Sequence, residues 1–181
     1  MTITLIGYRG SGKSSIAPLI ATRLGWQWAD VDRLIEKKAD KTIKDIFEQE
    51  GEPAFREIER EVVSELFQKK QMVIATGGGT VLSSQNRDHF IQGGPVIWLK
   101  ASVEGLFERI SKDPISEETR PSLTSKGGGI EEIQEVLQQR EPFYKECATI
   151  KIETENHTFD SIVKKIMQQL PNEITAGENQ T

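Results

Sequence analysis

The stretch Gly7-Tyr8-Arg9-Gly10-Ser11-Gly12-Lys13-Ser14 decides the fold of this 181-residue chain. It matches the pattern G-x-x-x-x-G-K-[ST] and stands between a β-branched run, Thr2–Ile6, and a segment with apolar residues at helical spacing, Ser14–Leu24. This order of strand, glycine loop and helix suits phosphate binding, because loop N–H groups and the helix N-terminus can surround phosphate oxygens. The chain is therefore predicted to bind a nucleoside triphosphate.

Each residue type in this loop has a chemical reason. Glycines let the backbone curl closely around the phosphates, the Lys13 ammonium is expected to reach the β- and γ-phosphates, and the Ser14 hydroxyl is expected to ligate Mg²⁺. The predicted nucleotide contacts in the loop are Gly7, Gly10, Ser11, Gly12, Lys13, Ser14 and Ser15.

Apolar runs alternate with helical patterns through the rest of the chain. Short strands are predicted at Gln27–Val31, Met72–Thr76, Pro95–Leu99 and Ala148–Glu153, with helical segments between them. Parallel strands need long crossover connections, which are normally right-handed helices. The sequence therefore predicts an α/β protein, a three-layer α-β-α sandwich around a parallel sheet.

The length suits one domain, which we expect to span residues 1–170. Residues 112–129 interrupt the pattern with two prolines, three consecutive glycines and many polar residues, which predicts a mobile lid. The polar residues 171–181 are expected to form a disordered tail.

Composition excludes several classes of protein. Lys plus Arg total 23 against 28 Asp plus Glu, so the net charge of −5 has the wrong sign for a nucleic-acid or anionic-membrane partner. The single cysteine, Cys147, excludes an internal disulfide and a Cys-rich zinc site. With no membrane-spanning run and no recognisable leader, we expect a cytoplasmic protein.

The second motifs that identify other classes of nucleotide-binding protein are absent from this sequence. The strand Met72–Thr76 ends in glycine, where motor and transporter ATPases carry an acidic residue, and no Asn-Lys-x-Asp tetrapeptide for guanine occurs. What remains is a kinase that phosphorylates a small acceptor, or a catalytically silent nucleotide-binding domain.

Three further features suit an acceptor site. Asp30 and Asp32 stand two residues apart at the end of the second predicted strand. One carboxylate could therefore hold hydrated magnesium and the other could contact an acceptor hydroxyl. The alternative is that Asp32 only caps the next helix. Arg56 and Glu59 lie on one helical face. Arg56 could contact the acceptor, or the two residues could form a surface ion pair. The glycines 77–79 end a strand where bare backbone permits close approach of a ligand.

Together these motifs resemble the shikimate kinase family over about residues 2–170. The resemblance rests on the phosphate loop, the D-x-D pair, and four further motifs: G-x-x-x-F-R-x-x-E at Gly51–Glu59, Gly77–Gly79, Arg120-Pro121, and Arg-x-Pro-x-Tyr at Arg140–Tyr144. It implies a five-stranded sheet of order 2-3-1-4-5 and transfer of phosphate from ATP to the 3-hydroxyl of shikimate.

The resemblance also implies roles for single residues. Arg56 and Arg140 would bind the shikimate carboxylate, and Asp32 would orient the attacking hydroxyl beside the backbone of Gly77, Gly78 and Gly79. Asp30 would hold Mg²⁺ through water, beside Ser14. Lys13 and Arg120 would stabilise the transferring phosphoryl group, Arg120 would contact ATP from the lid, and Arg109 would stack on adenine.

The sequence departs from the family pattern only in the predicted lid. The usual Arg-Pro-Leu-Leu reads Arg120-Pro-Ser-Leu123, and the stretch from Arg109 to Arg120 is longer than in compact members. The alternatives are another kinase of the same group, such as a gluconate kinase, and the silent domain. We expect a monomer, because every recognised catalytic group comes from one chain.

Overall fold

The structure, a computed structural model, describes residues 1–113 and 129–175. Five strands form one parallel sheet: β1 (Thr2–Ile6), β2 (Gln27–Asp30), β3 (Met72–Ala75), β4 (Val96–Lys100) and β5 (Ile150–Glu153). Their order is β2-β3-β1-β4-β5, which confirms the predicted topology. The strand that leads into the phosphate loop, β1, is central, with Thr2 paired to Met72 and Thr4 to Val96.

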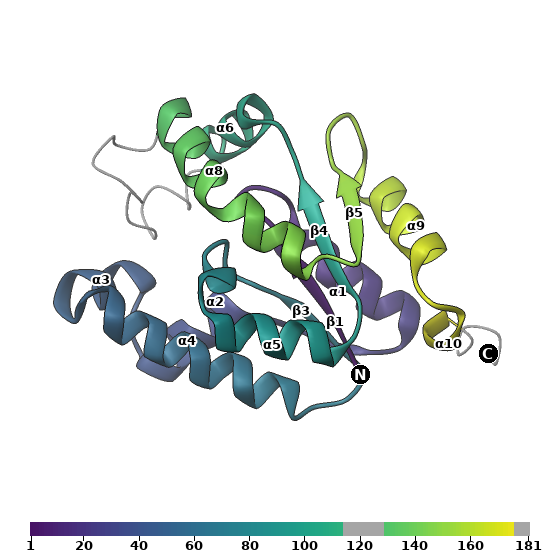
Figure 1. Ribbon diagram of the computed structural model, residues 1–181, viewed down its shortest axis with the longest axis horizontal. Coiled ribbons are helices and arrows are strands. Elements are labelled where there is room, and N and C mark those ends of the chain that lie inside the picture. The colour runs from purple at the N-terminus through teal and green to yellow at the C-terminus, as the bar shows by residue number, and fades with distance from the viewer. Residues whose placement is uncertain (114–128, 176–181) are drawn as a thin grey trace.

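Helices cover both faces of the sheet, which confirms the three-layer sandwich (Figure 1). One face packs on α1 (Lys13–Leu24) and α9 (Phe159–Gln169), in a core that includes Ile3, Leu5 and Ile166. The other face packs on α2, α4, α5 and α8, which span Val31–Ala39, Gly51–Phe67, Ser84–Gly93 and Ile130–Cys147. Alternation along β1 explains the division, because Ile3 and Leu5 face one layer and Ile6 the other.

Three further elements lie around the carboxyl ends of the strands. They are α3 (Ile43–Gln49), the 3₁₀ turn η1 (Thr80–Leu82) and α6 (Val103–Ser111). Local chemistry fixes several boundaries, since the hydroxyls of Thr42, Ser83 and Ser102 accept hydrogen bonds from the first turns of α3, α5 and α6. No described helix is long and apolar enough to cross a membrane.

The prediction of a disordered tail from residue 171 is wrong for its first part. Asn172–Thr175 forms a short helix, α10, and Ile174 is only 5% exposed. The side chain joins the core between α1 and α9, where it packs with Leu170 and Ile166. The prediction failed because it was based on the mostly polar composition of the tail and gave no weight to the buried Ile174. Residues 176–181 lie outside the described part of the chain.

The predicted lid is also mostly outside the described residues. Only residues 112, 113 and 129 of the interval 112–129 are described, so Arg120 and its neighbours have no described position. The lid therefore stays a prediction from the sequence.

Candidate active site

The phosphate loop joins the end of β1 to the start of α1 through three glycines with positive φ, Gly7, Gly10 and Gly12. Gly7 lies so close to β4 that a Cβ atom there would stand 2.4 Å from the Leu99 carbonyl oxygen. Any side chain would therefore force the loop off the sheet. Gly12 precedes α1 directly, so the loop leads straight into the positive end of the helix.

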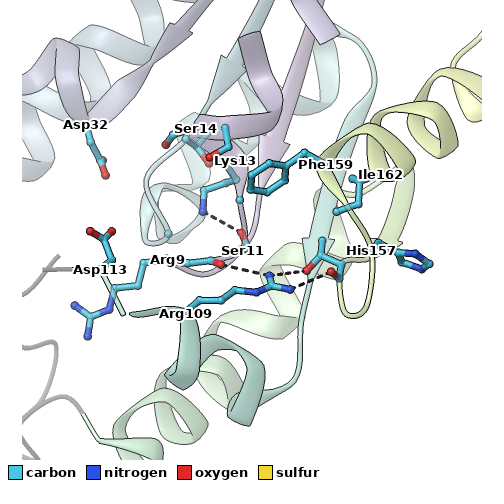
Figure 2. Close-up of a pocket in the computed structure, with 16 residues that line it drawn as sticks. Arg9, Ser11, Lys13, Ser14, Asp32, Arg109, Asp113, His157, Phe159 and Ile162 are labelled. Atoms are coloured by element: carbon cyan, nitrogen blue, oxygen red, sulfur yellow. Dashed lines mark hydrogen bonds between the residues drawn. The ribbon is translucent and has the colours of Figure 1, made fainter. Parts of the chain in front are cut away.

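Lys13 lies inside the curve of this loop and is 7% exposed. Its Nζ donates to the carbonyl oxygens of Gly7 and Tyr8, each at 2.8 Å, and to Ser11 Oγ at 3.3 Å. Figure 2 marks the last of these bonds. The ammonium is thus held by the loop that would surround the phosphates. This is the place that the sequence pattern assigns to it.

The two predicted magnesium residues are in direct contact. Ser14 Oγ donates to Asp30 Oδ2 at 2.5 Å, so a hydroxyl and a carboxylate face one point beside the loop. Both are hard oxygen donors of the kind that Mg²⁺ prefers. Among the described residues, no cluster of three or more acidic, His or Cys side chains forms a separate metal site.

The structure corrects the expected placement of the second aspartate. Asp30 ends β2 and caps α2, with Oδ1 accepting from the Arg33 backbone N–H at 3.3 Å. Asp32 is the second residue of α2 and does not lie on the strand. Asp30 and Asp32 therefore do not share one face of a strand, contrary to the prediction. The capping function belongs to Asp30, which leaves the Asp32 carboxylate to line the pockets.

The loop forms the floor of a cleft of about 500 Å³, within the usual range for small-molecule sites. Arg109 lines the cleft from α6, and its guanidinium donates to the backbone oxygen and hydroxyl of Thr154 at 3.0 and 2.9 Å. These bonds fix the plane of the group next to the phosphate loop, where its Nη1 also meets the Gly10 carbonyl at 3.5 Å. A fixed planar cation of this kind suits stacking on a nucleobase.

Sequence reasoning missed the wall of this cleft opposite Asp32. Phe159 and Ile162 of α9 line it, together with Thr154 after β5 (Figure 2). His157 is exposed and lines the same wall, with its ring nitrogen 2.7 Å from Lys165 Nζ. These residues carry no local motif, and only the packing of α9 on α1 brings them to the loop.

A second pocket adjoins the cleft and contains the predicted acceptor residues. Arg56, Arg140, Asp32 and the glycines 77–79 all line it. Its apolar wall, which sequence reasoning missed, consists of Ile43, Phe47 and Phe55. The Phe47 and Phe55 rings pack with centroids 4.8 Å apart. Cationic and acidic groups thus face an aromatic surface, an arrangement suited to a small carboxylated ring with hydroxyl groups.

Each of the three glycines packs against one functional side chain. A Cβ atom would stand 2.6 Å from Asp32 Oδ1 at Gly77, 3.4 Å from Arg140 Nη1 at Gly78, and 2.8 Å from an Arg56 nitrogen at Gly79. The sequence predicts that this bare backbone allows a ligand to approach closely. The geometry shows that it also lets the protein's own charged groups converge at the end of β3.

Arg56 is held by two carboxylates of its own helix. Its guanidinium donates to Glu52 Oε1 at 3.1 Å and to Glu59 Oε2 at 2.9 Å. Burial acts to lower the pKa of Arg56, but Glu59 and Glu52 outweigh it and raise the pKa. Glu59 is buried and also accepts from the Thr80 hydroxyl at 2.8 Å. The ion pair expected as an alternative therefore exists, and it fixes Arg56 at the pocket.

Arg140 enters the pocket from α8 and is 8% exposed. One helical turn further, Tyr144 is fully buried and its hydroxyl donates to the Gly78 carbonyl oxygen at 2.6 Å. Burial raises the pKa of Tyr144, although Arg140 acts to lower it, so the phenol stays a proton donor. This bond ties α8 to the glycine segment. It explains the tyrosine in the Arg-x-Pro-x-Tyr pattern.

Comparison with known proteins decides the family. The family described as shikimate kinase matches residues 9–171. The chain belongs to the shikimate kinase family. A shikimate kinase of Rhodopirellula baltica is 38% identical over 170 residues, which cover 94% of this chain and 90% of that protein. The resemblance inferred from the motifs is confirmed.

Solved structures agree with this family and with the fold. A shikimate kinase from Acinetobacter baumannii, solved in complex with shikimate, has a TM-score of 0.86 and 35% identity, and the match covers 92% of this chain and 90% of that chain. A gluconokinase from Sinorhizobium meliloti 1021 has a TM-score of 0.55 at 18% identity, covering 98% of this chain and 90% of that one. The second likeness concerns the fold alone.

Proposed function

We propose that this chain transfers the γ-phosphoryl group of ATP to the 3-hydroxyl of shikimate, giving shikimate 3-phosphate and ADP. The observation that carries the proposal is the acceptor pocket, in which Arg56, Arg140 and Asp32 face an aromatic wall and open onto the phosphate-loop cleft. Family membership and the relative solved with shikimate support the same acceptor.

The charges of the pocket match the acceptor. Shikimate carries one carboxylate, for which the forked guanidinium groups of Arg56 and Arg140 offer paired donors. Its hydroxyl groups need acceptors and donors, which Asp32 and the backbone around Gly78 and Gly79 supply. The rings of Phe47 and Phe55 cover the apolar face of the substrate.

Transfer forms a bond between the substrate oxygen and the γ-phosphorus and breaks the bond to the β,γ-bridging oxygen, which leaves on ADP. Asp32 orients the attacking hydroxyl and accepts its proton. Lys13 neutralises charge that develops on the phosphates. Arg120 is proposed as a second cation on the sequence pattern alone.

Ser14 and Asp30 fit a magnesium ion bound with ATP, because their oxygens already face one another. When bound, the ion would neutralise charge on the β- and γ-phosphates. Asp30 would hold it through water and Ser14 directly. Arg109 would stack on the adenine of the nucleotide.

One assay tests the proposal against its alternatives. ADP release is measured with ATP, Mg²⁺ and either shikimate or gluconate, and the product is identified by ³¹P NMR. We expect ADP release with shikimate and a phosphomonoester on its 3-oxygen. Activity only with gluconate would favour the other kinase, and nucleotide binding without turnover would favour the silent domain. The cytoplasmic location and the monomeric state stay predictions from the sequence.

A further inference from the structure

The nucleotide cleft and the acceptor pocket share three lining residues, Arg9, Asp32 and Gly78. The phosphoryl group must pass from one pocket to the other, so a side chain that lines both lies beside its path. Asp32 and Gly78 already have roles in acceptor binding. Arg9 stands at a variable position of the loop pattern and has none so far.

The structure places Arg9 at this junction. Its backbone nitrogen would be 3.3 Å from a Cβ atom on Gly78, so the phosphate loop and the glycine segment touch here. The guanidinium Nη2 lies 3.5 Å from Glu132 Oε1 on α8, and the two side chains are 11% and 0% exposed. Figure 2 shows Arg9 extending to the same side of the cleft as Asp32, away from Phe159 and Ile162.

The chemistry of this position favours a role in transfer. A guanidinium is charged at every working pH and offers five donors, and the contact to Glu132 at 3.5 Å and the interaction with Tyr8 do not use all of them. The Arg9 Nε–H is buried and has no hydrogen-bond partner within residues 1–113 and 129–175. Arg56 and Arg140 already match the single carboxylate of the acceptor, so the third arginine of the pocket is available for another anion.

We propose that Arg9 is a catalytic residue that contacts the phosphoryl group during transfer, and that Glu132 is a positioning residue that holds it at the junction. The inference rests on the proposed acceptor and extends the transfer step given above. Bonds and protons move as described there. Arg9 adds positive charge where negative charge shifts between ATP and the acceptor oxygen.

The first test compares Arg9→Gln with a matched control. Arg87→Gln removes another arginine that pairs with a glutamate of α8, Glu146 at 3.0 Å, and that is 14% exposed but lines neither pocket. We expect Arg9→Gln to lower kcat by about 10²–10³-fold, the usual loss for one electrostatic donor, with dissociation constants for shikimate and an ATP analogue changed little. Arg87→Gln should keep the kcat of the unaltered enzyme.

The second test concerns Glu132. Glu132→Gln should lower kcat by about tenfold, and adding it to Arg9→Gln should cause no further loss, because both changes act through one guanidinium. The double variant removes both charges of the Arg9–Glu132 pair, so it stays informative if either single variant folds poorly. Thermal unfolding of every variant checks that the fold is kept.

Three results would overturn the inference. A raised KM for shikimate with unchanged kcat would make Arg9 a third carboxylate ligand, and unchanged kinetics would make it structural. Independent, additive losses would remove Glu132 from the mechanism. If the unaltered enzyme phosphorylated another acceptor, the proposed function would fail, yet the same kcat comparison with that acceptor would still decide the role of Arg9.

Discussion

Arg56 offers a test of whether one guanidinium fork sets substrate affinity. Arg56→Lys keeps the charge but loses the paired donors, which costs about 1.5–3 kcal/mol, or roughly tenfold to a hundredfold in affinity. We expect KM for shikimate to rise by this factor while KM for ATP stays unchanged in steady-state kinetics. Arg60→Lys, on the same helix and outside both pockets, is the control. Wild-type KM in Arg56→Lys would reduce this residue to an ion-pair partner.

Asp32 allows a similar test of the chemical step. Asp32→Asn is nearly isosteric but removes the anion proposed to accept the hydroxyl proton, so kcat should fall by about 10²–10⁴-fold. Nucleotide binding, measured by calorimetry, should be kept. Asp40→Asn changes the residue at the opposite end of α2, where the left-handed conformation suits asparagine. Near-normal turnover of Asp32→Asn at saturating shikimate would contradict the proposed role.

Residues differ in how far the sequence predicts them, and the reason is the range of their contacts. The positions of Lys13, Ser14 and Asp30 are set by one local loop and by the next strand. The sequence pattern therefore predicts that these side chains lie close together. Glu59 and Thr80 are 21 residues apart, and no pattern in either segment predicts their hydrogen bond. Arg9 is a variable loop position whose partner lies 123 residues away.

Elements follow the same rule. Short runs of apolar residues, mostly β-branched outside β2, predict all five strands, and the observed ends differ by a few residues where caps decide them. Asp32 was misplaced because α2 begins directly after β2, with no loop residue between Asp30 and Val31. A pattern based on alternation cannot detect so abrupt a change from strand to helix.

The short helix α10 gives a prediction at this scale. Ile174→Ala should lower the free energy of unfolding by about 2 kcal/mol, because it empties a buried site at the edge of the core where neighbours can partly close the gap. Chemical denaturation measures the change. Glu173→Ala, an exposed neighbour on the same helix, should change stability by less than about 0.5 kcal/mol. Equal stabilities would restore the original expectation of a free tail.

At the scale of the whole molecule, α8 connects the core to the site. Its last residue, Cys147, can be used to measure how tightly the two are coupled. Cys147, the only cysteine of the chain, is 2% exposed and packs with Tyr144 and Trp98. Burial, reinforced by Glu146, raises the pKa of its thiol to about 11. The unfolded chain therefore releases this proton at lower pH than the folded one, so the free energy of unfolding should fall as pH rises from the ordinary thiol pKa toward about 11.

The same thiol can test whether the acceptor pocket and the core open together. At pH 8 the raised pKa alone should slow labelling by Ellman's reagent about a hundredfold relative to the unfolded chain, and burial should slow it further. Shikimate at a hundred times its dissociation constant stabilises the folded state by about 2.7 kcal/mol, which is again about a hundredfold. If α8 detaches only when the acceptor pocket opens, saturating shikimate should slow labelling by that full factor, and labelling in guanidinium supplies the reference. A labelling rate that does not change with shikimate would mean that the end of α8 opens independently of the acceptor pocket. The contact between Tyr144 and Gly78 would then not couple substrate binding to the stability of the core.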